Sequence, residues 1–375
     1  MSASRQRSVV ITPTVAGGLG DQAMVDVLVA QANALFGRPP VVAPNAHTVR
    51  TPSHIVNFAS GPLERVRLFV KTARARRVLM IGADVLDGHY GPKLIGRRLT
   101  LARFAHLAGA RVRVVGCSFS TRPHPETIAR LKRMTWLEIL ARDPVSKARM
   151  EAALGREVPL VADVAFLLEP AIDTEPARAA AQWIDGQRQA GRRVFALNVS
   201  GLVFGKLPGD RLERYAETVA ARLAEAGDVA ALVLPHDWRP DRVGDLGACR
   251  VLHAAVAARL GAACHLVEQP IHAWNAKALG GLVDAALLCR MHFAIACLGQ
   301  GTPPYCLVSA GKFEGLMQHF GLSGNLFDPE DFDGEDALAA PVARMLDHWQ
   351  EDAETARSAL PDVLALSREN FKDLA

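Results

Sequence analysis

The sequence predicts an α/β protein made of two Rossmann-like domains that face each other across a cleft. Three observations predict this fold. Short β-branched runs alternate with alanine- and leucine-rich helical stretches, a proline-containing segment interrupts the alternation, and the alternation then starts again. The 375 residues are also too many for one ordinary core, and a content of 50% hydrophobic and 22% charged residues excludes a disordered chain.

The first half of the chain predicts strands separated by helices. The strand candidates are Val9–Thr12, Arg77–Ile81, Arg111–Val115, Trp136–Leu140 and Leu160–Ala162. Two long helices are predicted between them, over Asp21–Leu35 and over Pro92–Leu107. This order is that of parallel βαβ units, in which ligands bind beyond the carboxyl ends of the strands.

The segment from Glu169 to Pro176 is the predicted linker, because two prolines within eight mostly polar or small residues can continue neither a helix nor a strand. A helix over Ala177–Gln189 follows. Strands are then predicted at Val194–Val199, Ala230–Leu234, Cys264–Val267, Ala285–Leu288 and Tyr305–Val308. We therefore expect an N-terminal domain over residues 1–170, a C-terminal domain over 171–335 and a helical tail over 336–375.

The spacing of the cysteines and the net charge exclude several classes of protein. Six cysteines show no C-x-x-C spacing and mostly lie in apolar runs, which favours reduced core thiols, a cytoplasmic location and no metal site. No apolar run approaches the ~18 residues of a membrane span. The net charge of +4 is too small to indicate a nucleic-acid partner.

That charge is distributed unevenly. From Leu63 to Arg113 there are twelve Lys or Arg residues against three Asp or Glu. A solvated arginine-rich surface is one interpretation of this segment. An anionic substrate or peripheral contact with an anionic membrane surface is the other.

The run from Ala16 to Asp21 reads Ala-Gly-Gly-Leu-Gly-Asp and opens a helix after the first strand. Glycines such as Gly20 leave the backbone N–H groups at a helix N-terminus accessible, and such groups can bind an anion or a sugar hydroxyl. Asp21 is either the N-cap of this helix or a catalytic carboxylate. The spacing matches neither a dinucleotide fingerprint nor a nucleotide-binding P-loop.

Arg142 follows a predicted strand and precedes a helix that Asp143 is placed to cap and that Pro144 is placed to begin. Because Arg142 has no capping role, it is either a surface arginine or an anion-binding one.

The strongest candidate site is the run from Leu287 to His292, where an apolar strand is followed by Arg290 and, two residues later, His292. In an extended chain these two side chains project to the same side, one for charge and one for proton transfer. The alternative for His292 is a helix cap or a half-buried structural ring. Lys312 lies between glycines near a helix start and is either a further anion contact or an ordinary exposed lysine.

His236 follows another predicted strand, in the run Pro235 to Trp238. It is either a substrate contact or a structural turn histidine. The neighbouring Asp237 cannot readily serve as its orienting acid, because adjacent side chains diverge.

These motifs, in this order, resemble the polysaccharide pyruvyl transferase family from about Val9 to Leu322. Arg-Asp-x-x-Ser and Arg-x-His are the most discriminating of them. The matching runs are Gly20-Asp21, Ile81 to Asp84, Gly116 to Phe119 (with Ser118), Arg142 to Ser146, Asp163 to Phe166, Asn198 to Ser200, Arg290 to His292 and Lys312 to Leu316.

The resemblance implies a fold similar to GT-B glycosyltransferases and phosphoenolpyruvate as donor. The pyruvyl group would be transferred as a ketal to two hydroxyls of a sugar in a cell-surface polysaccharide or its lipid-linked precursor, with release of phosphate. Arg142, Arg290, His292 and Lys312 would hold the donor, and such an anion favours arginine ligands. We assign His292 as general acid and Asp21 as base, and we expect Gly20, Ser118 and His236 to contact substrate. The scheme requires no metal or other cofactor.

Two alternatives remain open. One is a GT-B glycosyltransferase that uses a nucleotide sugar, with Arg290 and Lys312 on a diphosphate. The other is a non-catalytic member that acts as a scaffold in polysaccharide assembly.

Overall fold

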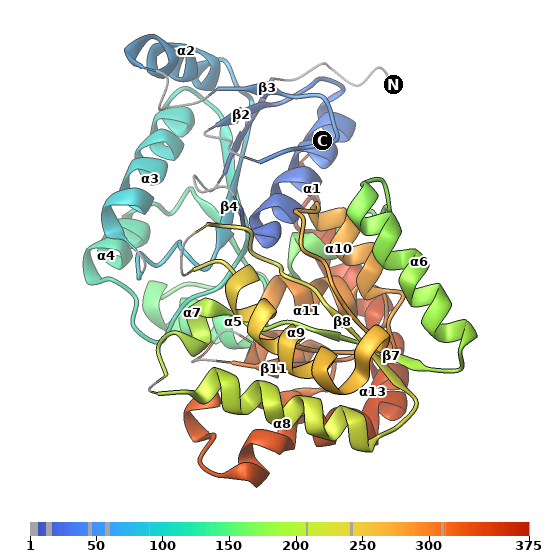
Figure 1. Ribbon diagram of the computed structural model, residues 1–375. Coiled ribbons are helices and arrows are strands. Elements are labelled where there is room, and N and C mark those ends of the chain that lie inside the picture. Colours follow the sequence, from blue (N-terminus) through green and yellow to red (C-terminus); the bar gives the residue numbers. More distant parts are fainter. Residues whose placement is uncertain are drawn as a thin grey trace. The chain divides into compact units, whose positions relative to one another are not determined.

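A computed structural model describes residues 7–12, 17–43, 47–56, 61–89, 91–207, 209–240, 243–308, 311 and 313–374. In these residues the chain forms two compact units, each with one six-stranded sheet (Figure 1). Unit 1 comprises Met1–Ala16, Asp21–Leu167 and Asp362–Ala375, and unit 2 comprises Gly17–Gly20 and Leu168–Pro361.

The sheet of unit 1 has the strand order β3-β2-β1-β4-β5-β6, and its paired strands are all parallel. The strands are β1 (Ser8–Ile11), β2 (Val41–Ala43), β3 (His54–Ile55), β4 (Arg77–Ala83), β5 (Arg111–Cys117) and β6 (Glu138–Ala141). The helices are α1 (Leu19–Phe36), α2 (Pro62–Ala73), α3 (Pro92–Leu107), α4 (Pro125–Arg133), α5 (Pro144–Leu154) and the 3-10 helix η2 (Val164–Leu167). β1 and β4 are buried almost throughout, which explains why both are continuous apolar runs.

The sheet of unit 2 has the order β12-β11-β10-β7-β8-β9 and is also parallel. Its strands are β7 (Arg193–Leu197), β8 (Val229–Val233), β9 (Cys264–Leu266), β10 (Ala285–Leu288), β11 (Pro304–Leu307) and β12 (Leu326–Phe327). Its α-helices are α6 (Glu175–Gln189), α7 (Gly201–Phe204), α8 (Arg211–Glu225), α9 (Leu246–Leu260), α10 (Ala273–Gly280), α11 (Met291–Leu298), α12 (Glu314–His319) and α13 (Glu335–Glu369), and its 3-10 helices are η3 (Gly261–Ala263), η4 (Ser323–Asn325) and η5 (Pro329–Asp331).

Numbered within its own unit, each sheet has the order 3-2-1-4-5-6, which is that of the Rossmann fold. The prediction of two Rossmann-like domains is therefore confirmed. The strand order reverses between β1 and β4 in unit 1 and between β7 and β10 in unit 2. Ligands of open parallel sheets bind at this switch point, beyond the carboxyl ends of the strands.

Some predicted elements differ from those observed. Leu160–Ala162 is not a strand, because only Leu160 forms a bridge, to Ala141. α1 begins at Leu19, so Asp21 lies in its first turn, and of the two alternatives for this residue the N-cap is wrong.

The C-terminal segment predicted as a helical tail over 336–375 is largely one helix, α13, and its residues belong to the two units. α13 begins at Glu335, and its apolar residues Leu338, Val342 and Met345 belong to the core of unit 2. The residues from Asp362 onward belong to unit 1, where the Asn370 side chain accepts a hydrogen bond from the backbone N–H of Gly116.

Among the described residues, one segment, Leu246–Ala263, is long and apolar enough to span a membrane by length and composition, contrary to the expectation from the sequence. It covers α9 and η3. Cys249, Leu252 and Val256 of α9 are buried in the core of unit 2, so the packing of a core helix accounts for the apolar composition.

Candidate functional site

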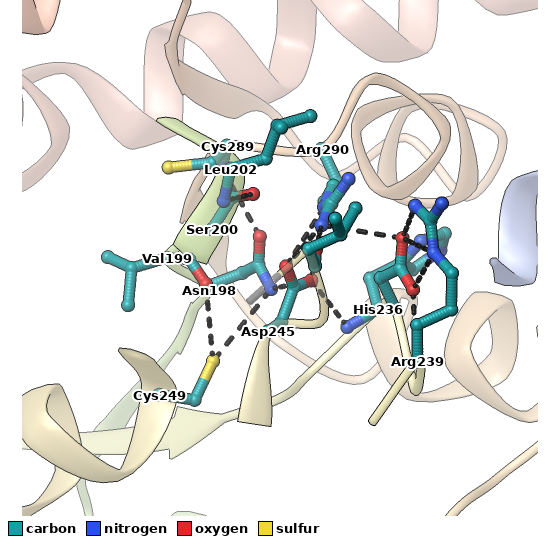
Figure 2. A network of polar contacts seen from close by, with 12 residues as sticks. Asn198, Val199, Ser200, Leu202, His236, Arg239, Asp245, Cys249, Cys289 and Arg290 are labelled. Carbon is teal, nitrogen blue, oxygen red and sulfur yellow. Dashed lines mark hydrogen bonds and ion pairs between the residues drawn. The ribbon is translucent and has the colours of Figure 1, made fainter. Parts of the chain in front are cut away.

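The switch point of unit 2 gathers polar side chains from loops that are far apart in the sequence (Figure 2). Asn198 follows β7, His236 follows β8, and Arg290 follows β10. Because the three strands are adjacent and parallel, their carboxyl ends bring these residues to the same edge of the sheet. Asp245, the residue before α9, lies among them.

Asp245 organises this group. Its side chain is 0% exposed and accepts hydrogen bonds from Arg290 Nε (2.9 Å) and Nη2 (2.7 Å), from Asn198 Nδ2 (3.1 Å) and from the backbone N–H of His236 (3.0 Å). Burial raises the pKa of Asp245 and the charge of Arg290 opposes that shift. A buried carboxylate with four donors fixes the direction of the arginine.

Only the Nε and Nη2 atoms of the Arg290 guanidinium make these contacts. Its Nη2 also donates to the backbone oxygen of Val243 (2.6 Å) and lies 3.4 Å from Oδ2 of Asp237. Nη1 forms no hydrogen bond with any described residue, and 16% of the side chain is exposed. Arg290 therefore presents one free edge while the other is held by carboxylates.

His292 lies against Gly20, within unit 2. α11 begins at Met291 with Arg290 as its N-cap residue, so His292 is in the first helical turn and not in the extended segment predicted from the sequence. A Cβ atom at Gly20 would lie 2.4 Å from both Cγ and Nδ1 of His292. Gly20 is thus required for the close approach of the ring.

The segment that carries Gly20 is itself attached to the loop after β8. The backbone N–H of Leu19 donates to the oxygen of His236 (3.2 Å), and that of Trp238 donates to the oxygen of Gly17 (2.9 Å). Gly18 forms an antiparallel bridge with Asp237. This loop therefore positions the backbone that supports the His292 ring.

His236 lies in the interior of the same group. It is 4% exposed, and its ring stacks on Phe293 of α11 with centroids 5.2 Å apart and an angle of 17°. Burial, followed by the proximity of His292 and Arg290, lowers the pKa of His236 to about 3. The ring is neutral at physiological pH, which fits a structural support for α11 more directly than an anion contact.

Three predicted site residues lie in unit 1, and two of them belong to one buried network. Arg142 is 4% exposed; its Nε donates to Ser118 Oγ (2.6 Å) and its Nη1 to Asp163 Oδ2 (2.8 Å). Ser118 Oγ donates to Asp143 Oδ2 (3.1 Å), and Asp143 caps α5 as predicted, by accepting from the N–H of Ser146 (2.6 Å).

This network keeps Arg142 charged. Burial alone would lower its pKa, but the nearby carboxylates of Asp163, Asp84 and Asp143 outweigh burial, and the pKa is raised. Arg142 therefore lies at the carboxyl end of β6, as predicted, but inside a cluster of carboxylates.

The third residue, Asp21, has a basic neighbour that the sequence analysis missed. Arg98 of α3 is 6% exposed, and its Nε and Nη1 are buried without a hydrogen bond. Burial lowers the pKa of Arg98, and the charge of Asp21 opposes that shift. The burial of Arg98 was not predicted, because this residue lies in an arginine-rich segment and the sequence does not distinguish a buried arginine there from an exposed one.

The structure thus brings together Gly20, His236, Arg290 and His292 in unit 2, and Ser118 with Arg142 in unit 1. Lys312 lies outside the described residues. Asp245 and Asn198 were not predicted as site residues. Asn198 stands in the Asn-Val-Ser run noted above, whereas Asp245 belongs to no motif.

Comparison with solved structures shows the GT-B fold. The UDP-GlcNAc 2-epimerase from Methanocaldococcus jannaschii has 13% identity and a TM-score of 0.59, with 96% of this chain and 99% of that chain covered. The α,α-trehalose 6-phosphate synthase from Burkholderia multivorans has 13% identity and a TM-score of 0.52, with coverage of 98% and 95%. A UDP-glucosyltransferase from Polygonum tinctorium has 12% identity and a TM-score of 0.59, with coverage of 100% and 98%.

At the level of sequence, no protein of curated function matches the chain significantly. The family model described as polysaccharide pyruvyl transferase matches residues 19–223, which is more than half of the chain. The match includes Asp21, Ser118 and Arg142 and ends before His236. With its two Rossmann-like units and this match, the chain belongs to the polysaccharide pyruvyl transferase family.

Proposed function

We propose that the protein transfers pyruvate from phosphoenolpyruvate to two hydroxyls of a sugar, as a ketal, with release of phosphate. The observation that carries this proposal is the group at the switch point of unit 2, where Arg290 offers the free edge of a guanidinium two residues from His292. Family membership supports the transferase activity. The donor and the ketal chemistry are our inference from the residues.

The residues of unit 2 match the needs of this donor. Phosphoenolpyruvate carries a phosphate and a carboxylate, and Nη1 of Arg290 can donate to either of them. His292 lies close to this arginine in the chain, in the first turn of α11. His292 in that turn is the proposed general acid, and Lys312 is a further proposed donor contact.

The reaction balances with these groups. Protonation of the methylene carbon by His292 makes the central carbon electrophilic, one sugar hydroxyl attacks it, and the second hydroxyl attacks as the bond to phosphate breaks. Of the two hydroxyl protons that are lost, one ends on the new methyl group and the other on the released phosphate. Asp21 is the proposed base for an attacking hydroxyl.

The remaining site residues have supporting roles in this proposal. Gly20 allows the close approach of His292, and His236 supports α11 through Phe293. In unit 1, Arg142 and Ser118 are proposed substrate contacts. A substrate anion would there compete with Asp163 for Nη1 of Arg142.

We propose a sugar of a cell-surface polysaccharide, or its lipid-linked precursor, as acceptor, and the cytoplasm as the location. The six cysteines support a reducing compartment, because all of them are buried and none forms a disulfide.

The direct test is incubation of the full chain with phosphoenolpyruvate and a panel of acceptor sugars. The expected result is release of phosphate together with a product that carries a pyruvate ketal. Thermal-shift measurements with phosphoenolpyruvate, UDP-sugars and GDP-sugars separate this proposal from a glycosyltransferase. Stabilisation by a nucleotide sugar alone would contradict it.

Substitution of His292 separates the proposal from a scaffold role. We expect His292→Asn to abolish pyruvylation of the polysaccharide in cells that depend on this chain. His265→Asn, which changes a half-buried histidine of β9 outside the group, is the matched control. Unchanged pyruvylation with His292→Asn would favour the scaffold.

A further inference from the structure

A basic cavity lies at the amino-terminal ends of strands in the unit 1 sheet. It has a volume of about 280 Å³ and is lined by Arg7, Ser8, Arg38, Pro39, Val41, His54, Val70, Lys71 and Arg74. Ser8 begins β1 and His54 begins β3, so the cavity is at the amino-terminal ends of the strands, away from the carboxyl ends where the candidate site lies. It belongs to no site described above.

The lining of this cavity is suited to an anion. Arg7, Arg38, Lys71 and Arg74 line it, and none of the described lining residues is acidic. None of these four cations forms an ion pair with a described residue. Clustered cations without counter-ions repel one another, and a bound anion relieves that repulsion.

Ser8 is a second and independent sign of a ligand. It lines the cavity, is 2% exposed, and its Oγ is buried with no hydrogen-bond partner among the described residues. Buried hydroxyls nearly always have a partner. Rotation of the Ser8 side chain toward the cavity would let a phosphate oxygen supply one.

The helix beside the cavity exposes apolar side chains. Only Leu68 and Thr72 are fully buried among the residues of α2 whose side chains are described, whereas Leu63 is 66% and Val66 58% exposed. Leu63, Val66 and Val70 share one face at helical spacing. In unit 1 α2 is a peripheral helix that lies over α3 (Figure 1).

The exposed face of α2 is continuous with the cavity, because Val70, Lys71 and Arg74 line the cavity from this helix and its C-cap. An apolar stripe flanked by Lys and Arg is typical of helices that lie in the interface of a membrane. A second copy of this chain fits less well, because a symmetric contact would place the cations of both copies against each other.

We propose that this surface, α2 together with the cavity, docks on a membrane that contains anionic phospholipids. The lipid phosphate enters the cavity, where Lys71, Arg74 and the Ser8 hydroxyl bind it, and Leu63 and Val66 contact the acyl boundary. The docking deepens the proposed function, since it would bring the enzyme to a lipid-linked acceptor. It is measured without either substrate, so its failure and the failure of pyruvyl transfer are distinguishable.

The test is flotation of the full chain with vesicles of phosphatidylcholine alone or mixed with phosphatidylglycerol. We expect binding to the mixed vesicles only, with a decrease at high salt. A lysine or arginine near an anionic surface contributes about 5-fold in affinity, so Lys71→Gln with Arg74→Gln is expected to weaken binding roughly 25-fold. Leu63→Ser with Val66→Ser is expected to weaken it by about 10-fold and to retain the salt dependence.

The matched control is Arg222→Gln with Arg259→Gln, which removes the same charge from exposed positions in unit 2. It is expected to bind like wild type. Equal binding to both kinds of vesicle, equal weakening by the control, or no binding would overturn the proposal. So would thermal stabilisation by inorganic phosphate without vesicle binding, or a dimer in solution that Leu63→Ser with Val66→Ser dissociates.

Discussion

Gly20→Ala is expected to displace the proposed general acid, His292, without removing any titratable group. A Cβ atom at this position would lie 2.4 Å from Cγ and Nδ1 of His292 and 2.7 Å from its Cβ. Non-bonded carbon atoms pack at about 3.5–4.0 Å. The ring or the first turn of α1 must therefore move by roughly 1 Å.

The two consequences of this shift differ in size. A displacement of ~1 Å in a reacting group lowers the rate by about 100-fold. Stability changes less: crowding of a packed contact costs about 1–3 kcal/mol, and alanine in a helix is favoured over glycine by roughly 0.5–1 kcal/mol. The variant should stay folded and lose most of its transfer activity.

The assay is pyruvyl transfer from phosphoenolpyruvate, or the pyruvate content of the polysaccharide in complemented cells, with urea unfolding measured in parallel. Gly18→Ala is the matched control, because the nearest atom to its Cβ would be Oδ2 of Asp237 at 4.0 Å, an ordinary contact. Full activity of Gly20→Ala would show that transfer does not depend on the position of the His292 ring. An equal loss with Gly18→Ala would show that the loss does not come from a shift of this ring.

Three further predictions concern stability and reactivity. Asp245→Asn breaks a buried ion pair with Arg290 and should lower the free energy of unfolding, measured in urea, by about 3–5 kcal/mol. Asp333→Asn, whose ion pair with Arg211 is exposed, should lower it by less than ~1 kcal/mol. Similar losses in the two variants would contradict the network. The pKa of His236 is lowered to about 3 from an ordinary value of ~6.5, so the contribution of the neutral ring to folding stability is complete above pH 6.5 and is lost as the pH falls. Between pH 6.5 and 4.5 the free energy of unfolding of wild type should therefore fall by about 2 kcal/mol more than that of His236→Gln. Parallel curves of stability against pH would disprove this. Burial raises the pKa of all six thiols, so a thiol reagent should label none of them in the native protein and all six after unfolding, and rapid native labelling would show that a thiol is accessible.

The fold was predictable where single segments carry enough information. The strand Ala285–Leu288 and the helix Pro92–Leu107 have the predicted bounds, because a strand buried on both faces is a continuous apolar run and a proline marks the first turn of a helix. β2, β3 and β12 were missed. They have three, two and two residues, too few to show a period, and β3 is exposed.

The candidate site was predictable only one residue at a time. Gly20, His236, Arg290 and His292 each follow a strand or open a helix, so each could be recognised in its own segment. Their grouping depends on strand order, which places β10 beside β7 and β7 beside β8. Asp245 could not be predicted, because its relation to Arg290 exists only after these three strands have paired.

The two arginines show why a motif alone does not define an anion site. Arg142 and Arg290 both follow a strand, and both contact carboxylates in the structure. Arg142 is 4% exposed and lies within its network, whereas Arg290 keeps Nη1 free of described partners. Because a charged group buried without compensation is very costly, a carboxylate is needed to hold each arginine in place before any ligand binds. The carboxylates offset much of the positive charge, so an anion at Arg290 would be bound more by directed hydrogen bonds than by net charge. Asp245, which determines that direction, therefore matters as much to the proposed donor site as the arginine itself.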